Sequence, residues 1–208
     1  MSEGRGISAV LLAAGAGSRF GGGKLLAPYR GRPLIEWPLS NLAEAPVDET
    51  VVVVGDDAER LRAVCEPYGA RVVKNPDWER GQSTSVRAGL RDLRPEVRAA
   101  VVLLADQPLV GPGAVERLVA AFEAGAKVAV ATYDGKRRNP VLFSREAWPV
   151  LEAELSGDEG ARAVLRRHPD LVTEVPCDGV GDPADVDTAE DLRDLERVHE
   201  GEDRFKMG

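Results

Sequence analysis

Short, almost wholly apolar segments alternate with segments of helical periodicity along most of the chain, and this alternation constrains the fold more than any other feature. The expected strands are 7–14, 50–55, 71–74, 99–105, 127–132, 141–143 and 171–175, and the expected helices are 33–44, 57–67, 83–93, 112–123, 145–155, 159–167 and 188–199. Continuous apolar strands are typical of a sheet covered on both faces. The order therefore predicts a doubly wound α/β fold with a mostly parallel sheet. The basic, turn-rich stretch 136–140 is expected to form a hairpin-like piece that leaves this sheet.

Composition excludes several classes of protein. The 208 residues are 43% hydrophobic and 30% charged, with a formal net charge of −8. This acidity argues against nucleic acid and against an anionic membrane surface as partners. Two distant cysteines, Cys65 and Cys177, make a structural zinc site or a disulfide framework a poor fit, so a cytoplasmic location is expected. We predict one domain over residues 1–199 and a flexible tail over 200–208.

A glycine-rich loop directly after the first strand is the first candidate site. Gly15, Gly17 and the run 21–23 lie in it, together with the cations Arg19 and Lys24. Successive backbone N–H groups in such a loop can cradle an anion, and the two cations extend this to a polyphosphate. The spacing matches neither a Walker A loop nor a dinucleotide-binding fingerprint. A flexible surface loop is the alternative interpretation.

Two aspartates that are far apart in the sequence are candidate metal ligands. Asp106 ends the apolar strand 99–105, where the carboxyl edge of a parallel sheet binds ligands. Asp187 precedes a capping-box pattern, Thr188 to Asp191, that begins the final helix. Mg²⁺ prefers one or two carboxylates together with substrate phosphates. Alternatives remain at both positions: Asp106 as a plain turn residue, and Asp182 or Asp185 in place of Asp187.

Two further polar segments could contact substrates. In 80–89, Gly81, Ser83 and Ser85 lie at a helix start with free N–H and hydroxyl groups, although for this motif alone an ordinary N-cap by Ser83 is the favoured interpretation. Asn139 and Pro140, and the segment with Asp158 and Arg162, could hold a second, anionic substrate or could be solvated turns.

The order of these motifs resembles the MobA-like nucleotidyltransferases, most closely the molybdenum cofactor cytidylyltransferases. The matching segments are 12–24, 81–89, 104–108, 139–143, 157–162 and 185–191. The resemblance implies a three-layer α/β/α Rossmann-like nucleotidyltransferase fold. It also implies transfer of CMP from CTP to the phosphate of molybdopterin, with release of pyrophosphate. Two positions depart from the family pattern: Phe20 stands where Met is usual, and Asn139 where many members have His.

The resemblance also implies roles for individual residues. Arg19 and Lys24 would hold the triphosphate, and Asp106 and Asp187 would hold Mg²⁺. The nucleotide site would include Leu12, Ala13, Ala14, Gly15, Gly17, Gly81, Ser83 and Ser85. Ala14, where GTP-using relatives tend to have Gly, favours CTP. The expected partners are an NTP, a phosphorylated pterin and a molybdoenzyme or its chaperone.

Other functions remain open at this point. A relative that uses GTP, or one that activates a sugar phosphate or another phosphorylated alcohol, would carry similar motifs. A module that senses NTP or carries the cofactor without catalysis is the alternative from another class. Such a module would tolerate loss of a metal carboxylate, whereas both candidates are present here.

Overall fold

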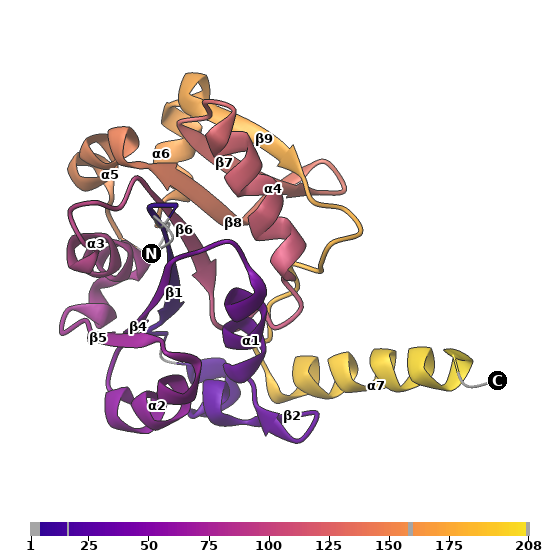
Figure 1. Cartoon of the computed structure of the whole chain (residues 1–208). Coiled ribbons are helices and arrows are strands. Elements are labelled where there is room, and N and C mark those ends of the chain that lie inside the picture. The colour runs from indigo at the N-terminus through magenta and orange to yellow at the C-terminus, as the bar shows by residue number, and fades with distance from the viewer. Residues whose placement is uncertain (1–4, 16, 158–159, 207–208) are drawn as a thin grey trace.

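A seven-stranded sheet with the order β5-β4-β1-β6-β8-β7-β9 forms the centre of the molecule (Figure 1). The structure is a computed structural model and describes residues 5–15, 17–157 and 160–206. The sheet strands are β1 (Ile7–Ala13), β4 (Glu49–Val54), β5 (Arg71–Lys74), β6 (Ala99–Leu104), β7 (Val128–Tyr133), β8 (Lys136–Ser144) and β9 (Val172–Pro176). All are parallel except β8, which is antiparallel to both neighbours. The predicted, mostly parallel sheet is confirmed.

The prediction that the basic stretch 136–140 leaves the sheet is wrong. Lys136 begins β8, which pairs with β6 on one side and β7 on the other. A tight turn at Asp134 and Gly135, both with positive φ (49° and 68°), joins β7 to β8. The buried second half of β8, residues 141–144, lies between β6 and β7, whereas Lys136 and Arg137 pair with β7 alone.

Helices cover both faces of the sheet, which confirms the three-layer α/β/α architecture. On one face lie α1 (Glu36–Glu44), α2 (Ala58–Cys65) and α4 (Pro112–Glu123), packed against Leu11 and its neighbours of the same side. On the other lie α3 (Gln82–Asp92), α5 (Trp148–Glu154) and α6 (Arg162–Arg167), packed against Val10 and Leu12. Alternate residues of one strand thus serve two cores, as the period of a strand requires.

Shorter elements complete the fold. A two-residue hairpin, β2 (Pro28–Tyr29) and β3 (Arg32–Pro33), was not predicted. Single 3-10 turns lie at Ser18–Phe20, Lys24–Leu26, Glu66–Tyr68, Trp78–Arg80, Arg145–Ala147 and Pro169–Leu171. The last helix, α7 (Ala189–Lys206), continues beyond its predicted end at residue 199 and projects from the body of the molecule (Figure 1). Over the described ranges, no helix is both long enough and apolar enough to cross a membrane.

Helix α3 lies unusually close to the central strand because Gly89 faces it. A Cβ at Gly89 would approach Cγ1 of Val10 to 2.3 Å and Cγ2 of Val53 to 3.1 Å. Any side chain there would push the helix off β1 and β4. This close packing fixes the first turn of α3 near the carboxyl end of β1.

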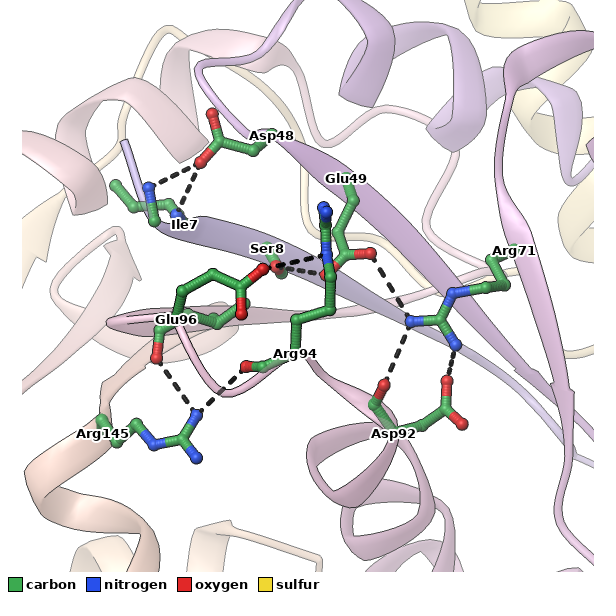
Figure 2. Close-up of polar contacts among 11 residues, drawn as sticks. Ile7, Ser8, Asp48, Glu49, Arg71, Asp92, Arg94, Glu96 and Arg145 are labelled. Atoms are coloured by element: carbon green, nitrogen blue, oxygen red, sulfur yellow. Dashed lines mark hydrogen bonds and ion pairs between the residues drawn. The ribbon is translucent and has the colours of Figure 1, made fainter. Parts of the chain in front are cut away.

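Ionic contacts close the amino edge of the sheet (Figure 2). The carboxylate of Asp48 accepts hydrogen bonds from the backbone N–H groups of Arg5 (3.0 Å), Gly6 (2.6 Å) and Ile7 (3.1 Å). Further along this edge, Glu49 accepts a hydrogen bond from the Ser8 hydroxyl and pairs with Arg71 and Arg94, and Arg71 also pairs with Asp92. These carboxylates hold strand ends together.

Candidate active site

The opposite, carboxyl edge contains the point where the chain reverses its direction across the sheet. From β1 the chain moves outward to β4 and β5, then returns to β6 on the other side of β1. Ligands of open α/β sheets bind in the crevice at such a point. The glycine loop follows β1 and Asp106 follows β6, so both candidate segments border this crevice.

The glycine loop folds back on itself through left-handed backbone conformations. Gly21, Gly22 and Gly23 have φ values of 90°, 94° and 64°, and the N–H of Gly22 donates to the carbonyl of Gly17 at 3.2 Å. Residues with a Cβ rarely adopt such a succession. The turn it makes returns Lys24 to the mouth of the crevice, beside the end of β6.

Lys24 joins the loop to both candidate metal ligands. Its Nζ lies 2.6 Å from Oδ2 of Asp106 and 3.7 Å from Oδ1 of Asp187. The Nη1 of Arg19 lies 3.0 Å from Oδ2 of Asp187. The Lys24 side chain is only 12% exposed, whereas that of Arg19 is 73% exposed. Four residues singled out in the sequence thus lie together, with one cation sheltered and one open to solvent.

The start of α7 places Asp187 at this site. The Asp191 carboxylate accepts hydrogen bonds from the N–H groups of Asp187 (2.9 Å) and Thr188 (2.7 Å), and the N–H of Asp191 donates to the Thr188 hydroxyl at 3.1 Å. The predicted capping box is confirmed. Buried Val186, which precedes Asp187, packs in a small core with Tyr29, Leu34 and Leu192. Packing and capping together orient the carboxylate toward the glycine loop.

Gln107 ties the acidic segment to Asp106 and was not singled out in the sequence. Its Nε2 donates to the Pro183 carbonyl and to Oδ1 of Asp185, both at 2.8 Å. The backbone carbonyl of Asp106 also accepts the N–H of Val186 at 2.9 Å. These hydrogen bonds hold Asp106 and the segment before Asp187 at a fixed separation. In the sequence, only the position of Gln107 beside a strand-end aspartate could have indicated that it links the two.

The competing aspartates have different environments. Asp185 accepts the Gln107 hydrogen bond, and desolvation, followed by the charge of Asp106, raises the pKa of its carboxyl. Exposed Asp182 accepts the N–H of Ala184 in a local turn. Of the three candidates in this segment, Asp187 is the one that pairs with both Arg19 and Lys24.

A cavity of about 460 Å³ opens beside these charges, between β1, β6 and the start of α3. Seven predicted residues line it: Leu12, Ala14, Gly15, Arg19, Gly81, Ser85 and Asp106. Ala13 and Gly17 line a smaller hollow with Lys24 instead. Ser83 is buried, and its N–H donates to the Gly157 carbonyl at 3.2 Å. An N-cap by Ser83 is wrong, because α3 begins at Gln82 and Gly81, at φ 109°, precedes it.

Other lining residues were missed in the sequence. Trp78, Glu79, Gln82 and Leu104 complete the wall of the cavity. Behind them, buried Asn75 donates to the hydroxyls of Thr84 (2.8 Å) and Ser85 (3.0 Å), and so orients Ser85. An Asn directly after a strand was a usable signal for Asn75, because such residues organise the turn that follows.

A second hollow, of about 180 Å³, lies on the same sheet face between α6 and the β7–β8 pair. Its base is apolar (Val130, Val141, Leu165), and its rim is cationic and polar (Arg137, Arg138, Asn139, Arg162, Arg166). Two of the predicted second-substrate residues, Asn139 and Arg162, line it, whereas Pro140 is buried in β8. Asp158 lies outside the described residues. Both planar and anionic parts of a ligand would find complementary surface here.

Neither cysteine has the environment of a nucleophile. Cys65 and Cys177 are both buried and free, and burial raises the pKa of the Cys65 thiol to about 11 and also raises that of Cys177. In the described ranges, no three His, Cys, Asp or Glu side chains group as a metal centre. The chemistry of the crevice is therefore that of two carboxylates and two cations beside a cavity.

Comparison with known protein families gives one family over most of the chain. The family described as MobA-like NTP transferase domain matches residues 9–172. The nicotine blue oxidoreductase of Paenarthrobacter nicotinovorans is 36% identical over 197 residues, which cover 89% of this chain and 94% of that protein. The 2-C-methyl-D-erythritol 4-phosphate cytidylyltransferase of Gloeobacter violaceus is 37% identical over 117 residues, 53% of this chain and 49% of that protein.

Solved structures show the same fold. The crystal structure of Rv0371c from Mycobacterium tuberculosis H37Rv has a TM-score of 0.82 and 34% identity, and covers 95% of this chain and 100% of that one. A second structure of Rv0371c, described as a complex with manganese, has a TM-score of 0.77 and 33% identity, over 92% of this chain and 98% of that one. A full-length relative has thus been solved with a divalent cation.

Proposed function

Because this chain belongs to the MobA-like NTP transferase family and is a nucleotidyltransferase, we propose that it transfers CMP from CTP to the phosphate of molybdopterin in the cytoplasm. The observation that carries the proposal is the convergence of Lys24, Asp106 and Asp187 beside the larger cavity. The cytidylyltransferase relative and Ala14 in the cavity wall favour CTP. The GTP-using and sugar-phosphate reactions remain the alternatives within the family.

The reaction needs little acid–base chemistry from the protein. An oxygen of the acceptor phosphate forms a bond to the α-phosphorus of CTP, and the bond from that phosphorus to the bridging oxygen breaks. Pyrophosphate leaves with the electron pair. The attacking phosphate oxygen is already anionic, so no side chain has to remove its proton. Catalysis then depends on positioning and on charge neutralisation, and the loop N–H groups, Lys24 and Arg19 supply both.

The site fits a divalent cation, for which Asp106 and Asp187 would be the ligands. A single ammonium lies within 3.7 Å of oxygens from both carboxylates, so one cation between them can contact each. Carboxylate oxygens are the ligands that Mg²⁺ prefers, and it takes the rest of its coordination from phosphates and water. When bound, the ion would neutralise charge on the phosphates. Lys24, displaced from the carboxylates, would then turn its ammonium to the triphosphate.

The second hollow supports the position of the acceptor. Arg162 and Asn139 line it, and the charge of Arg162 partly offsets the rise in the pKa of the Asp185 carboxyl that desolvation and Asp106 cause. This links the hollow with the acidic segment around Asp187. Its apolar base suits a flat heterocycle and its arginines suit a phosphate. We infer that a phosphorylated pterin lies here with its phosphate toward Asp106.

A direct test is pyrophosphate release from each of the four NTPs, with and without molybdopterin. We expect release with CTP that depends on both molybdopterin and Mg²⁺. A clear preference for GTP would overturn the CTP assignment. Pyrophosphate release with a sugar phosphate but not with molybdopterin would overturn the assignment of molybdopterin as the acceptor. Binding of NTP without any turnover would favour the sensing or carrier module.

The relative named nicotine blue oxidoreductase supports a second candidate, reduction of nicotine blue. The second hollow, with its apolar base, is the place proposed for this substrate. The assay is loss of the absorbance of nicotine blue in the presence of a reduced nicotinamide dinucleotide. Dye reduction without pyrophosphate release would replace the proposed function with this one.

A further inference from the structure

The three tryptophans of the chain have different environments. Trp37 donates its Nε1–H to the Tyr29 carbonyl at 3.1 Å, and the Arg32 guanidinium lies 3.7 Å from the centre of its ring. Trp148 is buried and donates to the Phe143 carbonyl at 3.3 Å. Within the described part of the chain, Trp78 Nε1 has no hydrogen-bond partner, and its side chain is half-buried in the wall of the 460 Å³ cavity. Trp37 and Trp148 therefore stabilise the fold, whereas the indole of Trp78 is available to contact a ligand in the cavity.

The backbone of Gly55 supports one face of the Trp78 ring. Gly55 follows β4, and a Cβ added to it would lie 2.9 Å from Cδ2, 3.0 Å from Cγ and 3.2 Å from Cδ1 of Trp78. Three similar distances to adjacent ring atoms place that position over the flat face of the indole. Any residue other than glycine would displace the ring. The chain thus holds a large aromatic ring flat against its backbone at the edge of the crevice.

The cavity has two chemically different ends. Asp106 follows β6 and lies with Lys24 of the glycine loop, at one end. Trp78 packs on Gly55, which follows β4, and β4 and β6 lie on opposite sides of β1, so Trp78 is at the other end. A nucleoside triphosphate has the same division, with a charged chain at one end and a flat aromatic base at the other.

We propose that Trp78, supported by Gly55, is the platform on which the nucleobase stacks. This inference rests on the proposed function and names the residue that holds the base. Every base has a π face, so stacking on an indole favours all four bases and contributes affinity more than selectivity. Selection among bases then falls to the polar groups of the cavity, including Gln82 and the Ser85 hydroxyl that Asn75 orients.

Two ligands separate the two ends of the cavity: CTP and inorganic tripolyphosphate, which has the charged chain but no base. CTP should quench the tryptophan fluorescence of the unmodified protein and of Trp37→Phe, but not that of Trp78→Phe. Tripolyphosphate should compete with CTP without quenching. Trp78→Ala should weaken CTP binding by about 10- to 100-fold, with tripolyphosphate affinity unchanged, and Trp78→Phe should retain most of the affinity.

Gly55→Ala is a second, independent variant, because it keeps the indole but moves it. It should weaken CTP binding and leave tripolyphosphate binding unchanged. Calorimetry measures both affinities, and a thermal melt checks the fold of each variant. Unchanged CTP affinity in Trp78→Ala, or quenching that persists in Trp78→Phe, would refute the stacking function alone. If neither ligand binds the unmodified protein, the proposed function fails together with this inference.

Discussion

Carboxylates lie at both edges of the sheet, but their partners differ. At the amino edge, Asp48 accepts hydrogen bonds from three backbone N–H groups, which cannot leave. At the carboxyl edge, Asp106 and Asp187 contact the flexible side chains of Lys24 and Arg19. Backbone partners make a carboxylate part of the scaffold. A side-chain cation, in contrast, can move away, and then the carboxylate can bind a metal and the cation can bind a phosphate. The same residue type thus stabilises one edge and remains available for chemistry at the other.

The largest effect should come from Asp106→Asn or Asp187→Asn. Each change removes one negative charge from the crevice, so we expect pyrophosphate release to fall by about 10²–10³-fold. Neither carboxylate accepts a hydrogen bond from the described backbone, so the melting temperature should change little. Asp182→Asn, on the exposed turn of the same segment, is the matched control. Near-normal turnover in either active-site variant would remove that residue from its assigned function.

Gln107→Leu should give the next largest effect. The Oε1 atom of Gln107 is buried without a partner among the described residues, so leucine loses only the two hydrogen bonds of Nε2. Loss of these bonds frees the acidic segment to move away from Asp106. We expect Mn²⁺ affinity, measured by electron paramagnetic resonance of the free ion, to fall by about 10- to 100-fold. Unchanged Mn²⁺ affinity would mean that packing alone positions Asp187.

Asp48→Ala should show the opposite behaviour to Asp106→Asn. Three N–H groups lose a charged acceptor, but the site is exposed and water replaces part of the loss. We expect a decrease of about 1–2 kcal/mol in the free energy of unfolding, seen by urea denaturation. Turnover per folded molecule should stay the same. A drop in turnover without a drop in stability would show that the two edges are coupled.

The smallest effect should be a pH dependence at the start of α7. Hydrogen bonds from the side chain and then the backbone of Thr188 hold the pKa of the Asp191 carboxyl below its usual range. A lowered pKa in the folded state means that the cap stabilises the protein above about pH 4 and loses this effect as the pH falls further. The difference in melting temperature between the unmodified protein and Asp191→Asn should therefore be full at neutral pH and shrink in acid. A difference that stays constant with pH would show that the carboxylate charge does not matter.

The sheet was well predicted from the sequence because strands that are buried on both faces are continuous runs of apolar residues. The sequence predicts all seven sheet strands, although for β8 it predicts only residues 141–143 and places 136–140 outside the sheet. The exposed half of β8, Lys136 to Arg138, has no apolar pattern, and only pairing with β7 makes it part of the sheet. Local sequence does not encode that pairing.

The site was predictable where a charged residue lies next to a recognisable sequence pattern. Lys24 lies in the glycine loop, Asp106 follows an apolar strand and Asp187 precedes a capping box, and the structure brings the three together. Gln107 lies beside Asp106 but carries no charge, and Trp78 has neither feature. Trp78 lies between a strand and a helix with no pattern around it, and its position depends on Gly55, 23 residues earlier in the chain. Contacts between segments that are distant in the sequence depend on packing and have no local sequence pattern.

The link between Lys24, Asp106 and Asp187 has a consequence for the growing polypeptide on the ribosome. Strands β1, β4, β5 and β6 lie within the first 104 residues, so Lys24 and Asp106 can meet early in synthesis. Asp187 emerges only after the remaining strands, immediately before α7. Since domains fold as their segments emerge, a nascent chain has its glycine loop long before its second carboxylate. The three side chains can come together only after the chain has been made as far as Asp187.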